Sequence, residues 1–327
     1  MEVWNALSSN HEALRSIALA GAAFVGLPFL IWRTIIANKQ STAALRQART
    51  SEDNHVSDMF SKAIEQLAAE KEDGKPILAQ RIGALYSLEQ VANNNTQYYD
   101  QIMEVLCAYI RLESPVLPRQ EDTNYEYDGP PRSETLRFEG SPREDVHIAL
   151  TIVGRCLPAH KKKRVLNLTE THLVNASLYK ANLSGANFTR ASLAGAKVAG
   201  GDLSEIIFWG ADLEFIDITE CDLSKADMRC ASVSEATIER SVLSEVDLSH
   251  SRLRSTIIRQ TILRKSDLTS AQMQSAFLQN VDLNEAELKQ VDLSYAKLEN
   301  TELNDTLRDR GIVDNATQDG ASLDQYG

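Results

Sequence analysis

The chain has 327 residues, of which 43% are apolar and 24% are charged, so its composition excludes a globally disordered chain. Lys and Arg total 34 against 46 Asp and Glu, and the resulting net charge of −12 disfavours a protein that coats nucleic acid. The four cysteines include no CxxC pair and, with the six histidines, form no zinc-binding spacing, so reduced thiols in a cytosolic compartment are expected.

An apolar segment near the N-terminus predicts one membrane span over residues 16–37. If Arg33 snorkels to the headgroups, this segment reaches the ~20 residues that a helix needs to cross a bilayer. A cleaved signal peptide and a buried core helix are the alternatives, and the charge of Arg33 at the cleavage region disfavours the signal peptide. Lys or Arg occurs once in residues 1–15 and four times in residues 33–50. The N-terminus is therefore expected outside and the C-terminal domain in the cytoplasm, at the inner (plasma) membrane.

Three amphipathic patterns follow the span and predict a helical region. These helices cover residues 42–72, 78–93 and 97–112. An acidic, Pro-containing stretch over residues 113–141 reads as a linker, and Pro142 suits the first position of a further helix. The helices contain no catalytic constellation, because Arg81, Glu89 and Arg111 are expected on solvated faces or in local ion pairs.

From residue 166 onward an apolar residue returns every five positions. There are 28 such markers, from Leu168 to Leu303, and the register never slips. A small residue stands two positions before the marker in 22 of these 28 repeats. A period of five fits neither a helix nor a strand. It fits a square solenoid in which each side points one large and one small side chain inward, because a second large residue would overfill the interior.

The repeat reads A(D/N)Lxx, as in Ala181-Asn182-Leu183-Ser184-Gly185 and Ala211-Asp212-Leu213, and it resembles the pentapeptide-repeat family. The resemblance implies an all-β, right-handed quadrilateral β-helix with four repeats per turn, and hence about seven coils. Upstream, residues 81–89 and the segment 145–155 are similar to bacterial, membrane-anchored members of the family. The expected order is a short tail (1–15), the transmembrane helix (16–37), an α-helical neck (38–112), the linker (113–141), a capping helix with a basic turn (142–164), the β-helix (165–305) and a C-terminal tail (306–327).

Charge is distributed unevenly along the predicted rod. Eight acids accompany a single base between residues 202 and 227, whereas five bases and no acid lie between Arg252 and Lys265. The candidate acidic band consists of Asp202, Asp212, Glu214, Asp217 and Asp222. Some members of the family are soluble proteins whose acidic rods imitate duplex DNA and bind type II topoisomerases, so the resemblance implies a DNA-mimicking inhibitor or protector of such an enzyme as the alternative function. Ordinary solvated charge accounts for both bands as well.

Apolar residues stand at several outward positions of the predicted rod. Residues 20 apart lie on one side of adjacent coils, so Val242 stacks with Ile262, and Ile257 stacks with Phe277 on the adjoining side. Exposed apolar clusters of this kind mark interfaces, and drift on an unconstrained side is the competing explanation. The candidate partner surface consists of Val242, Ile257, Arg259, Ile262, Arg264 and Phe277.

The sequence therefore predicts a membrane-tethered protein–protein interaction scaffold without catalysis, cofactor or metal. The expected partners are an unidentified protein or a second copy of the chain, together with the membrane through residues 16–37; nucleic acid is not expected. A basic run at the entrance to the rod is a candidate contact for anionic lipid headgroups, with a plain solvated loop as the alternative. This run is Lys161, Lys162, Lys163 and Arg164.

Overall fold

The structure is a computed structural model. It describes residues 39–40, 42, 46–47, 50–51, 53–71, 74–116, 141–156, 166–301, 313–318 and 321–322. The predicted tail 1–15, the predicted membrane helix 16–37, the basic run 161–164 and most of the predicted linker lie outside these residues. Among the described helices, none is both long enough and apolar enough to cross a membrane.

The chain divides into two compact units, Met1–Ser61 and Lys62–Gly327. The described residues of the first unit are helical. This helix ends at residue 67, five residues before the predicted end, and Glu70 then pairs with Pro76 in an antiparallel bridge.

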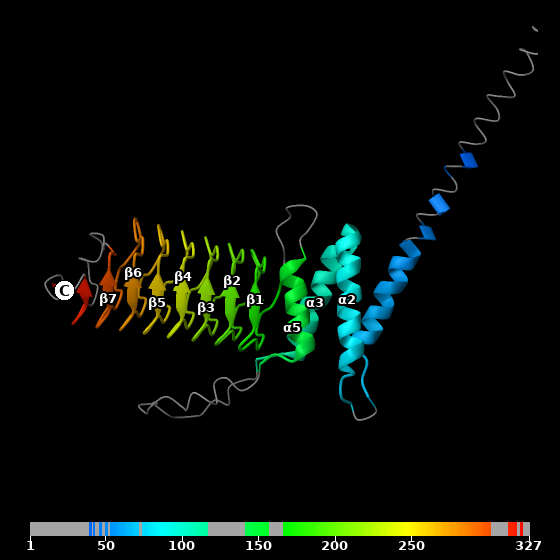
Figure 1. The fold of residues 1–327 in the computed structure, drawn as a ribbon, viewed down its shortest axis with the longest axis horizontal. Helices are drawn as coiled ribbons and strands as arrows, with labels where there is room; N and C mark the ends of the chain where they lie inside the picture. Colours follow the sequence, from blue (N-terminus) through cyan, green and yellow to red (C-terminus); the bar gives the residue numbers. More distant parts are fainter. Residues whose placement is uncertain are drawn as a thin grey trace, which may run out of the picture. The chain divides into compact units, whose positions relative to one another are not determined.

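From Leu78 onward the second unit forms a helical cap, which comprises α2 (Leu78–Asn94), η1 (Thr96–Tyr98), α3 (Tyr99–Glu113) and α5 (Glu144–Arg155). The apolar stripes that predicted these helices meet in one core. Its fully buried members include Leu85, Leu88, Ile102, Leu106, Ile110, Leu150 and Ile152. Figure 1 shows α5 lying between the other two helices and the first strand of the sheet. Helix α5 therefore lies between the rest of the cap and the first coil of the repeats.

The repeats form an all-parallel β-solenoid of about seven turns. Each turn contributes one three-residue strand, and the strands lie side by side in chain order (Figure 1). They are β1 (Ser177–Tyr179), β2 (Lys197–Ala199), β3 (Asp217–Thr219), β4 (Thr237–Glu239), β5 (Ile257–Arg259), β6 (Phe277–Gln279) and β7 (Lys297–Glu299). Paired residues are 20 apart, as in Leu178↔Val198, so one coil contains four pentapeptides. This register confirms the five-residue period.

Each pentapeptide places its marker inside the coil and then turns a corner. In the repeat around Leu223, the marker is fully buried, and the N–H of Ala226 donates a hydrogen bond to the Leu223 carbonyl at 3.0 Å. The corner residue Lys225, two positions after the marker, has a φ of 60°. Its N–H donates to the carbonyl of Ser244 in the next coil at 2.9 Å. Hydrogen bonds between coils therefore offset the strain of left-handed corners at non-glycine residues.

The cap covers the first edge of the solenoid. Pro115 forms an antiparallel bridge with Thr171, and the N–H of Val116 donates to the Glu170 carbonyl at 2.8 Å. The N–H of Asn182 donates to the carbonyl of Gly154 in α5 at 2.7 Å. These bonds occupy backbone groups that an open edge would leave unpaired. The first residues of the predicted linker 113–141 thus pair with the rod, and residues 117–140 lie outside the described residues.

The sheet also continues past residue 305, where the repeats were expected to give way to a tail. Strand β8 (Thr317–Gln318) pairs in parallel with β7, and Lys297 aligns with Thr317, again 20 residues apart. Strand β9 (Ala321–Ser322) then pairs with β8 in the antiparallel direction. The change of direction ends the parallel stack.

Two helical glycines test the contact between cap and rod. A Cβ added at Gly154 would lie 2.8 Å from the Cβ of Ala181, whereas one added at Gly83 in α2 would meet nothing within 4 Å. We expect Gly154→Ala to lower the free energy of unfolding by about 1–3 kcal/mol, because α5 must move off the first coil. Gly83→Ala should raise it by about 0.5–1 kcal/mol through helix propensity. Urea unfolding of both variants measures this difference, and equal shifts would contradict the observed contact.

Candidate functional site

The four apolar residues predicted to lie on the rod surface occur as two stacked pairs. Val242 forms a parallel bridge with Ile262, and Ile257 pairs with Phe277 between β5 and β6. Ile262 is 38% exposed, and the other three side chains are half-buried. We call Val242, Ile257, Ile262 and Phe277 the apolar patch. The predicted stacking is confirmed.

The positions of Val242 and Ile262 elsewhere hold a polar residue with a local structural role. In the preceding coil, Asp222 accepts a hydrogen bond from the N–H of Ser224 at 2.9 Å. In the following coil, Asp282 accepts one from the N–H of Asn284 at 3.1 Å. A carboxylate at this position caps the turn. Val and Ile cannot accept a hydrogen bond, so the two apolar side chains forgo the cap that their neighbours in the same column have.

The two arginines predicted beside the patch already have partners within the rod. Arg259 Nη1 lies 3.0 Å from Glu239 Oε1, and its guanidinium lies over the Phe277 ring at 5.3 Å. Lys297 approaches the same ring at 5.4 Å. Arg264 forms an ion pair with Asp282. These contacts hold Phe277 between two cations and fix the direction of both guanidinium groups. The two arginines were expected at the partner surface, but both are already paired within the rod.

The predicted acidic band is distributed around the rod. Asp202 and Asp222 are bridged in adjacent coils of one side, whereas Asp217 lies in β3 on the adjoining side. Asp212 and Glu214 lie in the pentapeptide just before β3. Asp202 accepts hydrogen bonds from the N–H and hydroxyl of Ser204, and Glu214 accepts one from Ser232. The five acids therefore occupy three sides and take part in hydrogen bonds within the rod.

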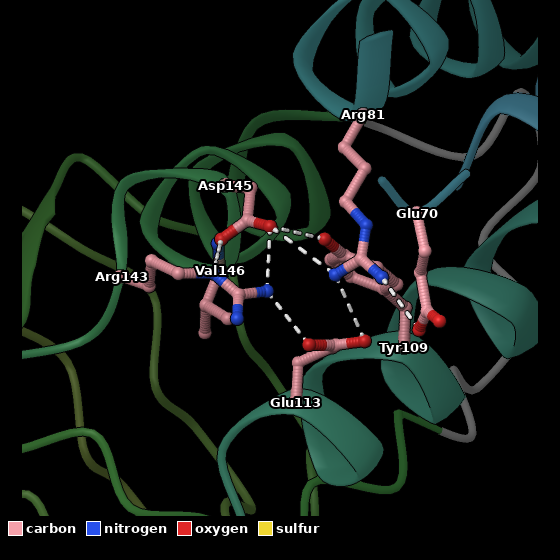
Figure 2. A network of polar contacts seen from close by, with 7 residues as sticks. All are labelled: Glu70, Arg81, Tyr109, Glu113, Arg143, Asp145 and Val146. Carbon is pink, nitrogen blue, oxygen red and sulfur yellow. Dashed lines mark hydrogen bonds and ion pairs between the residues drawn. The ribbon is translucent and has the colours of Figure 1, made fainter. Parts of the chain in front are cut away.

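A buried polar network in the cap was not predicted from the sequence (Figure 2). Asp145, at the start of α5, is fully buried. Both of its oxygens accept from Arg143 at 2.7 Å, and Oδ2 also accepts from the Tyr109 hydroxyl at 2.5 Å. Burial raises the pKa of Asp145, but the bonds from Arg143 and Tyr109 outweigh it and lower the pKa below its ordinary value. Burial and the bond to Asp145 raise the pKa of Tyr109.

Arg81 of α2 enters the same network from the opposite side. It is 3% exposed, and its Nη1 lies 3.0 Å from Glu113 Oε1 and 3.8 Å from Asp145 Oδ2. Figure 2 shows Arg81, Glu113 and Asp145 converging from three helices. The expectation of a solvated face is wrong for Arg81, because the pairing occurs within the core of the cap.

The other two charged residues considered in the helices also link elements. Glu89 of α2 pairs with Arg155 of α5. Arg111 of α3 donates to the carbonyl of Asn167 in the first coil. The ion pair joins two helices of the cap, and the hydrogen bond fixes the cap on the rod. Within the described ranges, no group of three or more His, Cys, Asp or Glu residues is arranged to hold a metal ion.

Comparison with known proteins identifies the repeats. The family model described as pentapeptide repeats matches in eight copies, over residues 167–210, 206–244, 234–269, 247–284 and 271–306. None of the curated proteins compared with the chain matches it significantly.

Several solved structures are similar over the solenoid. Full-length QnrB1, a plasmid-mediated fluoroquinolone resistance protein, is 20% identical, and the match covers 49% of this chain and 79% of QnrB1 with a TM-score of 0.31. HetL, a pentapeptide repeat protein involved in heterocyst differentiation regulation in the cyanobacterium Nostoc sp. strain PCC 7120, is 24% identical. That match covers 48% of this chain and 91% of HetL with a TM-score of 0.22. A pentapeptide repeat protein from the thylakoid lumen of Arabidopsis thaliana is 18% identical over 43% of this chain and 71% of its own, with a TM-score of 0.14.

Proposed function

We propose that this protein, whose residues 167–306 form a pentapeptide-repeat domain, is a membrane-tethered scaffold that binds a protein partner through the apolar patch. Pentapeptide-repeat proteins are typically structural or binding proteins, and the repeat fold fits a protein-interaction role. The solenoid supplies a rigid rod with its side chains at fixed spacing. The cap closes one end of the rod and connects it to the N-terminal part of the chain.

The tether is inferred from the sequence. Residues 16–37 carry one charged residue, Arg33, and their length suits a single membrane span. The excess of Lys and Arg over residues 33–50 favours a cytoplasmic rod. The run Lys161–Arg164 follows the cap, and we propose that it contacts anionic headgroups when the rod lies near the bilayer.

The observation that carries the binding role is the pair Val242 and Ile262. Both replace turn-capping residues in a column where Asp222 and Asp282 keep the cap. Ile262 is among the few large apolar side chains in the described part of the chain that are exposed to solvent. Removal of such side chains from water upon binding stabilises a complex by roughly 1.5–3 kcal/mol for each full burial. Covering the patch would therefore be favourable. The turns themselves do not explain why Val242 and Ile262 are apolar, because a polar residue would cap them.

DNA mimicry is the second candidate, and the net charge of −12 favours it. The contacts of the acidic residues weaken the case for DNA mimicry, because Asp202 and Asp222 cap their own turns. Turn capping within the fold is thus enough to explain why these two positions hold Asp. A DNA mimic also needs its charges on one continuous surface, whereas the acidic band covers three sides.

Replacement of all four patch residues by Asp tests the binding role. We expect Val242→Asp, Ile257→Asp, Ile262→Asp and Phe277→Asp together to abolish the complexes that the detergent-solubilised full chain forms, since charged side chains would need desolvation at the interface. Circular dichroism should still show β-structure. The matched control carries four substitutions at exposed polar positions of other sides. Those substitutions are Arg252→Asp, Gln290→Asp, Glu235→Asp and His250→Asp.

The readout is the set of proteins recovered with each variant. Recovery of the same complexes by the patch variant would contradict the proposal and direct attention to the acidic band. Loss of complexes from the control as well would show that the added charge, and not the patch, is responsible.

A further inference from the structure

Charged residues of alternating sign form a ladder along one corner of the rod. We call the side of the rod that follows each strand along the chain the Ile262 side. The ladder lies on this side, at the position two residues after the marker. Its members are Glu205, Lys225, Glu245, Lys265 and Glu285, one in each successive coil. Lys225 Nζ lies 3.9 Å from Glu245 Oε2, and Lys265 Nζ lies 3.7 Å from Glu285 Oε2. These side chains are more than half exposed, so they remain accessible to a second molecule.

The ladder and the apolar pair share one centre. Val242 and Glu245 belong to one coil, and Ile262 and Lys265 belong to the next. Consider a twofold axis that passes midway between these two coils. It is perpendicular to the rod and runs along the chain direction of the Ile262 side. Rotation about this axis produces a second, antiparallel copy in which the two coils have exchanged places. It places Val242 opposite Ile262 of the second copy and Glu245 opposite Lys265 of the second copy. One coil further out, the same axis places Lys225 opposite Glu285.

From this self-complementarity we infer that two copies of the chain pack antiparallel through their Ile262 sides. The inference rests on the proposed function in one respect, since it assigns half of the apolar patch to a second copy of the chain. The centre of the interface is apolar, with Val242 and Ile262 from each copy. The corner contributes four ion pairs between the copies, two of Glu245 with Lys265 and two of Lys225 with Glu285. Ile257 and Phe277, on the strand side, stay available to a different partner.

Like charges also meet across this axis, in two symmetry-related pairs. Asp222 of one copy faces Asp282 of the other, because each lies one coil outside the apolar pair. Asp282 is already paired with Arg264 of its own copy. Arg264 stands one coil nearer the axis, so its guanidinium lies beside both carboxylates and compensates them. In this arrangement Arg264 helps to orient the two copies at the patch. Its ion pair with Asp282 within the rod does not by itself give it that role.

The interface is small, since the Ile262 side of the four coils that the axis pairs is only about 19 Å long at ~4.8 Å per coil. Association in dilute solution is therefore expected to be weak. Confinement of both copies to one membrane raises their effective concentration and favours the pair. Ion pairs at an exposed corner contribute orientation more than affinity.

Two charge reversals test the antiparallel arrangement. In a pair of identical Glu245→Lys copies, two lysines face each other across the axis, and in a pair of identical Lys265→Glu copies, two glutamates do. Each variant alone should therefore lose association. In a mixture of the two variants, the introduced lysine of one copy faces the introduced glutamate of the other, and the unchanged Lys265 faces the unchanged Glu245. The mixture should regain association, which a general loss of stability cannot produce.

Association is measured by energy transfer between donor- and acceptor-labelled full-length chains, in detergent solution over a concentration series and in vesicles. The labels are attached at Cys230, which is exposed, whereas the other three cysteines are buried. Glu235→Lys carries the same charge change on another corner and should leave transfer unchanged. Thermal melting of every variant checks that the rod is intact.

We expect each single variant to weaken association by about tenfold or more and the mixture to recover it. Any of three results would overturn the inference. They are absence of transfer for the unaltered chain in both media, unchanged transfer in the single variants, and failure of the mixture to recover transfer. A chain that fails to enter vesicles contradicts the tether but leaves the detergent series to decide association. Recovery of a partner protein by an unaltered chain that shows no transfer in either medium would preserve the proposed function while excluding the antiparallel pair.

Discussion

Asp145→Asn is expected to cost about 3–5 kcal/mol of folding free energy, the largest effect of any single substitution proposed for this protein. The carboxylate is fully buried and accepts from Arg143, Tyr109 and the N–H of Val146. An amide carries no charge, so the buried guanidinium of Arg81 would lose part of its compensation. Urea unfolding followed by far-ultraviolet circular dichroism measures the loss. A cost below about 1 kcal/mol would contradict the role given to this network.

Asp202→Asn is the matched control, because Asp202 is exposed and Asn also caps turns. It should change stability by less than about 0.5 kcal/mol.

The same network gives a pH dependence of defined sign. The pKa of Asp145 is lowered in the folded state from its ordinary value of 3.8. Its contribution to stability is therefore complete above that value and is lost as the pH falls through the lowered folded pKa. The stability of the Asn variant should accordingly fall less between pH 5 and acid pH than that of the unaltered chain.

Ala231→Leu should destabilise the rod by roughly 2–3 kcal/mol. Ala231 is fully buried two positions before the marker Val233, and it stacks between Ala211 and Ser251 in the column of small residues. A leucine there must enter space that a methyl group fills, and the adjacent coils cannot separate without loss of their hydrogen bonds. Differential scanning calorimetry should show a clear fall in Tm.

Ser234→Leu provides the control in the same repeat, because Ser234 points outward one position after the marker. Its melting temperature should remain close to that of the unaltered chain. Equal falls for Ala231→Leu and Ser234→Leu would show that the inward and outward positions are assigned incorrectly.

The solenoid could be predicted from the sequence because its period is local and repeated. An apolar residue at every fifth position and a small residue two places before it define which side chains point inward. The observed pairing of Leu178 with Val198, 20 residues on, follows from four such units per coil. The stacking of Val242 on Ile262 follows from the same arithmetic. Beyond residue 305 the polar residues Arg308 and Gln318 occupy marker positions, although Val313 and Ala316 are in register and buried, so β8 was missed by a rule that required an unbroken series.

The cap could be predicted only as separate helices. Amphipathic spacing gives the apolar faces of α2, α3 and α5, but it does not show which charged side chains meet when those faces pack. Arg81, Glu113 and Asp145 are 32 and 64 residues from one another along the chain, and no local spacing joins them. The pairing of Pro115 with Thr171 depends likewise on the first coil having an open edge. A buried charge of this kind is recognised from tertiary packing, after the helices have been assembled.

The surface predictions differ in how well they agree with the geometry. Stacking of apolar residues followed from the 20-residue coil, whereas the clustering of acids in sequence did not produce clustering in space. Acids between residues 202 and 227 span more than one complete coil, so consecutive members turn onto different sides. Partners such as Ser204 and Ser232 follow from contacts within and between coils.

Sidedness of Cys230 in washed membranes is the most direct test of a rod tethered at the cytoplasmic face. The full chain is produced in a bacterial host, intact cells or opened cells are treated with a membrane-impermeant maleimide, and labelling is read in the carbonate-washed membrane fraction. Cys230 is exposed on the rod, while the other three cysteines are buried. We expect the chain to remain in the washed membranes and Cys230 to be labelled only after the cells are opened. Labelling of Cys230 in intact cells, or loss of the chain from the washed membranes, would contradict this expectation.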